Sequence, residues 1–145
     1  MPQYTPIGKI KELIVHHTDS DRDTTTFEEI RQWHLQKGWV DIGYHFVFTG
    51  DGKQHIGRPQ TVMGSQALHH NSNALGLCVT GNFEKQEPSD EQVHSLIQTL
   101  AILCKKYKLK PSAIKGHRDV NDTTCPGRNL YNKLPYIREQ VAKYL

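Results

Sequence analysis

The sequence predicts an α/β (α+β) fold, in which helices flank a central mixed sheet. The fold class follows from the order of the segments: short apolar segments with strand character alternate along the chain with longer segments whose apolar residues recur at helical spacing. The number of domains follows from a second observation. The chain has 145 residues, the length of one ordinary domain, and it shows no internal repeat, linker or low-complexity stretch. We therefore expect a single domain over residues 1–145.

The first half of the chain contains one predicted helix between short strands. Residues 10–15 are rich in apolar side chains and are predicted to form a buried strand. After a polar loop, Thr26 and Glu29 have the spacing of a capping box and indicate where a helix begins. Residues 44–56 are predicted to form a β-hairpin that turns at Asp51-Gly52.

The second half contains the longest predicted helix. Residues 75–80 form another short apolar strand, and Ser89 then caps a helix that extends to residue 107 with one apolar face. Residues 113–116 are predicted to form a last short strand. Apolar residues at helical spacing over 134–141 indicate a terminal helix.

Composition excludes several classes of function. Lysine and arginine total 18 against 15 acidic residues, a net charge of +3, which is too small for a dedicated nucleic-acid binder. The mean hydropathy is −0.64, and no stretch approaches the roughly 20 apolar residues of a membrane helix. We expect no nucleic-acid partner, no membrane insertion and a monomer.

The cysteine count and the first residues bear on the compartment. Three cysteines is an odd number, which argues against a disulfide framework, and we expect Cys78 and Cys104 to be buried thiols. Residues 1–6 lack a basic region followed by an apolar core, so no signal peptide is visible. We expect synthesis in the cytoplasm.

The chain contains nine histidines, an unusual number for its length. Histidine is the commonest metal ligand, so this count raises the question of a metal site. His16 follows the first predicted strand, His117 follows the last one, and Cys125 lies eight residues beyond His117. Histidine and cysteine are zinc ligands, and three protein ligands leave one position for water. Spacing alone leaves a second interpretation open, namely surface histidines and a loop thiol. His34, beside Trp33, is expected to pack inside.

Several ordered motifs resemble one enzyme family. The segments Asp41-Ile42-Gly43-Tyr44-His45-Phe46, Asp51-Gly52, 71–83 and 117–127 resemble the zinc N-acetylmuramoyl-L-alanine amidases of the type-2 group, which includes the T7-type phage lysozymes and the peptidoglycan recognition proteins. The resemblance extends from about residue 14 to about residue 127. It implies a mixed sheet with a zinc cleft at one face, and makes residues 1–145 a single amidase domain.

The resemblance also implies the reacting groups. The family's zinc ligands correspond to His16, His117 and Cys125, and its active-site tyrosine corresponds to Tyr44. Two residues before the cysteine, many relatives have lysine, whereas this chain has Thr123, as the recognition-protein amidases commonly do. The implied reaction is hydrolysis of the amide that joins N-acetylmuramic acid to L-alanine, with Tyr44 and Thr123 as catalytic hydrogen-bond donors.

Three further residues are expected at the substrate. Asn71 matches a cleft asparagine of the family, and Gln66 stands where relatives often have histidine. Glutamine can hydrogen-bond a sugar or a peptide but cannot titrate. His45 lies in the tyrosine motif, where a contact to the substrate and a place behind the site are both open.

The resemblance favours a phage or prophage endolysin, which acts on the cell wall after release. A non-catalytic peptidoglycan-binding module is one alternative, and retention of Cys125 argues against it. A cytoplasmic muropeptide-recycling amidase is another, but such relatives typically have aspartate at the position of Cys125 and lysine at that of Thr123. A regulatory contact with a phage RNA polymerase, known for T7-type lysozymes, finds no matching motif in residues 1–9.

Overall fold

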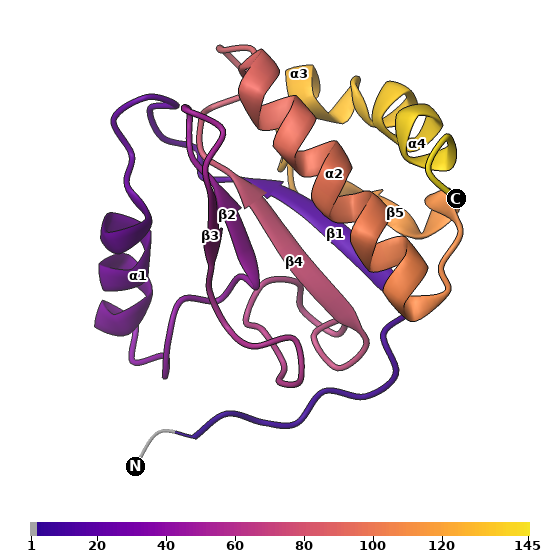
Figure 1. The fold of residues 1–145 in the computed structure, drawn as a ribbon. Helices are drawn as coiled ribbons and strands as arrows, with labels where there is room; N and C mark the ends of the chain where they lie inside the picture. Colours follow the sequence, from indigo (N-terminus) through magenta and orange to yellow (C-terminus); the bar gives the residue numbers. More distant parts are fainter. Residues whose placement is uncertain (1–2) are drawn as a thin grey trace.

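A computed structural model of the chain describes residues 3–145 and contains one five-stranded sheet with helices on both sides (Figure 1). The strands are β1 (Glu12–His17), β2 (Phe46–Phe48), β3 (Gln54–Ile56), β4 (Ala74–Val79) and β5 (Ile114–Gly116). The helices are α1 (Phe27–Gln36), α2 (Asp90–Tyr107), α3 (Arg128–Tyr131) and α4 (Leu134–Ala142), with 3₁₀ turns η1 (Pro111–Ala113) and η2 (His117–Asp119).

The sheet is mixed, as the sequence predicts. Its order is β3-β2-β4-β1-β5, and β1 pairs in parallel with β4 on one side and β5 on the other. Strand β2 is also parallel to β4, whereas β3 pairs antiparallel to β2 through the expected hairpin. Parallel pairing places the carboxyl ends of β1, β4 and β5 at the same edge of the sheet.

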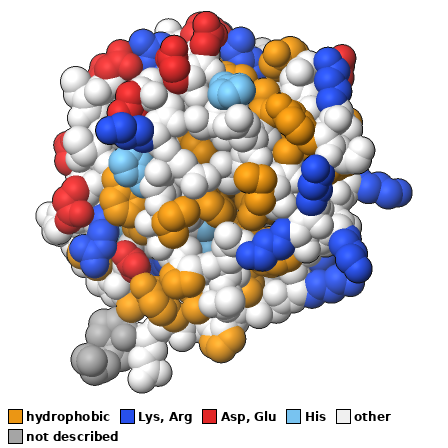
Figure 2. Space-filling view, in the orientation of Figure 1, with side chains coloured by type: hydrophobic (Ala, Val, Ile, Leu, Met, Phe, Trp, Pro, Cys, Tyr) orange, Lys and Arg blue, Asp and Glu red, His pale blue; other side chains and the backbone are white. Residues whose placement is uncertain are grey.

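Helices α2 and α4 cover one face of the sheet and enclose the larger core. Ser89 and Gln92 form the expected capping box at the start of α2, and Leu96 and Leu100 on its inner face are buried against the sheet. Acidic residues lie in the first turn of α2 and lysines in its last, and Figure 2 shows the Lys and Arg side chains gathered where this helix ends. That arrangement suits the helix dipole.

The opposite face of the sheet is covered mainly by α1, at one side. Thr26 and Glu29 form the expected capping box of α1, and Ile30 packs with Val47 and Cys78 in a smaller apolar cluster. Along β1, side chains alternate between the two faces. Leu13 and Val15 enter the larger core, so His16 points to the face that α1 covers only in part.

The structure differs from the expected elements at several boundaries and in its short elements. Strand β1 extends to His17, so His16 lies inside a strand whose hydrogen bonds to β4 fix its backbone. Strand β2 begins at Phe46, and Tyr44 therefore lies in the segment before it. The short elements η1, η2 and α3 were not predicted, because three- and four-residue turns carry no periodic pattern. Within residues 3–145, no helix combines the length and apolarity that a membrane crossing needs.

Candidate active site

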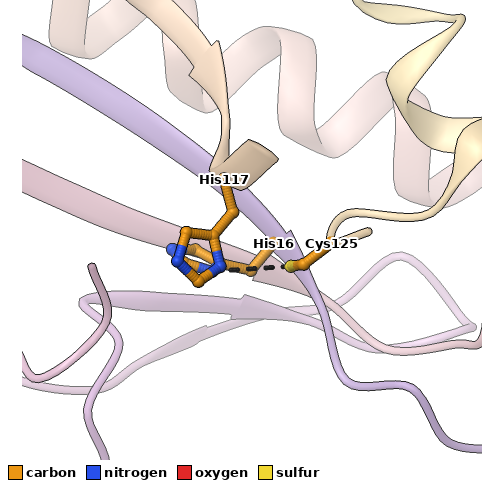
Figure 3. A group of neighbouring side chains, drawn as sticks. All are labelled: His16, His117 and Cys125. Carbon is orange, nitrogen blue, oxygen red and sulfur yellow. Dashed lines mark hydrogen bonds between the residues drawn. The ribbon is translucent and has the colours of Figure 1, made fainter. Parts of the chain in front are cut away.

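Three side chains with metal-ligand chemistry meet at the carboxyl end of β1. His16 comes from β1, His117 begins η2 directly after β5, and Cys125 lies in the loop before α3 (Figure 3). One ligand atom from each residue lies within 4.8 Å of the other two. The residues that the sequence singled out are therefore neighbours in space, although 109 positions separate His16 from Cys125.

The three donors fit a zinc ion. The Sγ atom of Cys125 lies 3.7 Å from Nδ1 of His16. Zinc bonds nitrogen at about 2.0–2.1 Å and sulfur at about 2.3 Å, so tetrahedral geometry separates the two ligand atoms by roughly 3.6 Å. A set of two imidazoles and one thiolate also leaves a fourth position for water or substrate, as catalytic zinc sites do.

Hydrogen bonds to each histidine ring determine which of its two nitrogens is available to bind a metal. Nε2 of His16 lies 2.5 Å from Oε1 of Gln66, and Nε2 of His117 lies 2.8 Å from Oδ1 of Asn121. An amide oxygen only accepts hydrogen bonds, so each of these contacts is a hydrogen bond when Nε2 carries the proton. In that tautomer Nδ1 is unprotonated, which is the form that binds a metal.

Burial sets the charge state of the site. Desolvation, with the neighbouring His117 as the next cause, lowers the pKa of His16 to about 3. Desolvation also raises the pKa of the Cys125 thiol to about 12, against the opposing effect of the backbone N–H of His17, which lies 3.4 Å from the sulfur. The imidazole is thus a neutral ligand at pH 7, while the thiol becomes a thiolate when a cation displaces its proton.

The three residues lie in a cleft of about 470 Å³. Its lining includes four of the other residues expected at the site, namely Tyr44, Gln66, Asn71 and Thr123. Asp19 also lines the cleft and has a positive φ of 57°, a strained conformation of the kind that gathers at functional sites.

Tyr44 and Thr123 bring neutral hydroxyl groups to the cleft. The Tyr44 ring lies 5.1 Å from that of His16, centroid to centroid. Burial and the nearby thiols of Cys78 and Cys125 raise the pKa of Tyr44 well above its usual value, so its phenol keeps its proton. The Thr123 hydroxyl accepts a hydrogen bond from the Cys125 backbone N–H at 3.2 Å, which leaves its own proton available to donate.

The three residues expected at the substrate have structural contacts of their own. Gln66 is buried against His16, and Asn71 accepts hydrogen bonds from the backbone N–H groups of Gln66 and Ala67, both at 3.0 Å. His45 is fully buried behind the cleft; its Nδ1 accepts from the Gly76 N–H, and its Nε2 lies 2.8 Å from the Val62 carbonyl oxygen. Of the two places that the sequence left open for His45, the structure shows the one behind the site, because backbone groups occupy both ring nitrogens.

Part of the cleft lining comes from residues that the sequence did not assign to the site, although it left Trp39 open between stacking on a sugar and packing in the core. His34, which was expected only to pack, lines the cleft together with Lys37 and Trp39. Its Nδ1 accepts a hydrogen bond from the Gly43 N–H at 2.8 Å, and its ring lies 5.4 Å from that of Tyr44. Proximity in the sequence could have indicated this, because Gly43 and Tyr44 belong to the motif that begins two residues after Trp39.

The family comparison agrees with this geometry. The pattern of the N-acetylmuramoyl-L-alanine amidases matches residues 6–128. The endolysin of Enterobacteria phage T3 is 33% identical over 134 residues, which cover 88% of this chain and 87% of that enzyme. Peptidoglycan-recognition protein SC2 of Drosophila melanogaster is 31% identical over 129 residues, covering 83% and 70% of the two chains.

Solved structures share the fold. N-acetylmuramoyl-L-alanine amidase LysC from Clostridium intestinale URNW superposes with a TM-score of 0.81 at 34% identity, covering 99% of this chain and 93% of that one. Bumblebee PGRP-SA gives a TM-score of 0.83 at 26% identity, covering 92% and 86%. With a family match over most of its length, a mixed sheet like that of these relatives and a cleft that holds two histidines and a cysteine, the chain belongs to the N-acetylmuramoyl-L-alanine amidase family.

Proposed function

We propose that this protein hydrolyses the amide bond between N-acetylmuramic acid and L-alanine in peptidoglycan, with a zinc ion held by His16, His117 and Cys125. The main support for the proposal is that these three metal-ligating side chains, two imidazoles and one thiol, meet in an open cleft of a chain from this family. A bound zinc ion supplies an acidified water, with a pKa near 7, and polarises the scissile carbonyl group.

The surrounding side chains stabilise the charge that develops on the carbonyl oxygen. Tyr44 keeps its phenolic proton and can donate it in a hydrogen bond from one side of the cleft. Thr123 donates from the loop that contains Cys125. Neither group is positively charged, so this site stabilises the oxyanion by neutral donors where lysine-containing relatives use a cation.

The substrate lies along the cleft that these residues line. Trp39 and Lys37 form one wall, with the Lys37 ammonium 4.9 Å from the centre of the Trp39 ring. An aromatic face offers a surface for a sugar or an apolar stem residue, and the ammonium group attracts a carboxylate of the peptide stem. Asn71, which also lines the cleft, holds the backbone of Gln66 and Ala67 in place through two hydrogen bonds.

The biological setting that fits is a phage or prophage endolysin. Endolysins of phages T3 and T7 and of Klebsiella phage KP32 are among the relatives that share 32–36% identity with the chain. In this setting the protein is made in the cytoplasm, acts as a monomer and reaches the cell wall after release.

Peptidoglycan binding without catalysis is the second candidate, because recognition proteins share the fold. One experiment separates the two. The purified protein is incubated with peptidoglycan with and without a strong chelator, and new L-alanine amino termini are counted; zinc is then restored. We expect release that stops on chelation and returns with zinc. Reducing sugar as the product, or release that survives complete zinc removal, contradicts the proposal.

A further inference from the structure

Each histidine of the candidate metal site contacts a side-chain amide through its Nε2 atom. Oε1 of Gln66 lies 2.5 Å from Nε2 of His16, and Oδ1 of Asn121 lies 2.8 Å from Nε2 of His117. We propose that Gln66 and Asn121 are positioning residues that keep both rings in the Nε2–H tautomer, so that both Nδ1 atoms face the metal. The inference rests on the zinc chemistry proposed above and changes the role expected of Gln66 from substrate contact to support of a ligand.

The surroundings of Gln66 fix its side chain in one place. Asn71 accepts hydrogen bonds from the backbone N–H groups of Gln66 and Ala67, which holds the main chain on both sides of the Gln66 side chain. The side chain lies flat against Gly76 of β4, where an added Cβ atom would come within 2.7 Å of Cγ of Gln66. Only 8% of Gln66 is exposed, so it is not free to turn toward a substrate.

The nitrogen of the Gln66 amide differs from its oxygen in having no protein partner within the part of the chain that the structure describes. Its Nε2 atom is buried and has no hydrogen-bond partner among residues 3–145. Buried polar groups in proteins are nearly always paired, and exceptions gather where function requires them. The Gln66 amide therefore has its carbonyl oxygen on His16 and a nitrogen with no protein partner among the described residues.

Asn121 connects the second histidine to the same segment. Its Nδ2 atom donates a hydrogen bond to the Leu68 carbonyl oxygen at 3.1 Å, while its Oδ1 atom faces His117. Residues 65–71 therefore anchor both rings, one through Gln66 and the other through Asn121. Both supporting groups are uncharged amides, which orient the rings without adding negative charge beside the ligands.

Zinc affinity measured by competition with a chromophoric chelator tests the proposal. Gln66→Met keeps the length of the side chain but removes the acceptor, and we expect zinc binding weaker by about 10–100-fold. Gln66→Glu keeps an acceptor for the Nε2 proton and should retain most of the affinity. Gln60→Met is the matched control, because Gln60 bonds Lys106 and Tyr107 away from the cleft, and should bind like the wild type.

A role in packing alone gives the opposite order. If Gln66 only fills space, the methionine variant binds zinc as the wild type does and the buried glutamate binds worse; that order overturns the proposal. Asn121→Leu and Asn121→Asp form the second pair, with the same expected order. Circular dichroism and thermal unfolding of each variant confirm that the affinities compared are those of folded proteins.

The wild-type protein provides a test that needs no substitution. Nitrogen-15 NMR of the imidazole rings in metal-free protein should show the proton on Nε2 of His16 and of His117; protons on Nδ1 overturn the proposal. Cys125→Ala separates this failure from failure of the zinc function. If it loses zinc while Gln66→Met does not, only the positioning role is wrong. If the wild type itself binds no zinc, both proposals are wrong.

Discussion

The two faces of the sheet differ in what is buried on them. Under α2 and α4 the core is a continuous apolar cluster to which β1 contributes Leu13 and Val15. On the other face, buried polar groups such as His16, His45 and Arg58 each hydrogen-bond a specific partner. Arg58, 5% exposed, donates to three backbone carbonyl groups. The comparison teaches that the face under α2 and α4, the apolar face, is stabilised by one large apolar cluster. The other, the polar face, combines smaller apolar clusters with polar side chains held in fixed geometry.

The largest expected effect comes from the polar face. Cys125→Ala removes the thiolate ligand, and we expect amidase activity to fall by at least about 10³-fold because zinc is no longer held. The thermal stability of the metal-free protein should change little, since Cys125 belongs to none of the apolar clusters. L-alanine release and a melting curve measure the two quantities.

Cys104→Ala is the matched control for that change. Cys104 is a free thiol inside the apolar cluster under α2. Its loss should lower stability and leave the turnover of folded protein intact. If both cysteine variants lose activity to the same extent, the contrast between the faces does not hold.

The apolar face should give the second largest effect, on stability alone. Leu100 is fully buried on α2. Leu100→Ala leaves a cavity, and we expect the free energy of unfolding to fall by about 2–5 kcal/mol. Urea titration measures this loss, and the activity per folded molecule should stay near that of the wild type. A large loss of turnover in fully folded protein would contradict the separation.

Acid should destabilise the protein through the polar face. Burial lowers the pKa of His45 to about 4, below the value of about 6.5 in the unfolded chain. The neutral ring therefore contributes stability that is fully present above pH 6.5 and is lost as the pH falls toward 4, of the order of 3 kcal/mol. Unfolding by urea at pH 7, 5.5 and 4.5 measures the loss.

Two histidine variants assign that loss to His45. In His45→Gln the slope of stability against pH should become shallower. In His94→Gln it should remain, because His94 is exposed on α2. An unchanged slope in His45→Gln would place the acid sensitivity elsewhere.

The smallest effect in the series belongs to a single hydroxyl group. Tyr44→Phe removes the phenolic donor from the cleft and keeps the ring that lies beside His16. We expect kcat to fall by about 10–100-fold, with zinc affinity and stability near those of the wild type. Wild-type turnover in this variant would exclude the phenol from the mechanism and leave Thr123 as the donor to test.

The same contrast explains how much could be predicted from the sequence. Strands and long helices follow from periodic apolar residues and capping boxes, and α1 and α2 begin where Thr26 and Ser89 indicate. The helices and strands that form the apolar face are the part of the fold that such periodicity describes. They can be predicted from local sequence patterns, without knowing which residues they contact in the folded protein.

The polar face depends on contacts that no local pattern encodes. The meeting of His16, His117 and Cys125 was expected only through the family resemblance, because spacing left surface histidines as an alternative. The hydrogen bonds of Gln66 and Asn121 could not be predicted, since each joins residues through tertiary geometry. His34 shows the same limit, because its ring packs inside and also lines the cleft.

The close packing of Gln66 on Gly76 has a consequence for engineering this enzyme. A Cβ atom at position 76 and the present side chain at position 66 would occupy the same space. Positions 66 and 76 are therefore a coupled pair, although one lies in a loop and the other in a central strand. A mutagenesis library that varies residue 76 alone will return mostly inactive clones, whereas one that randomises both positions together can find compensated solutions.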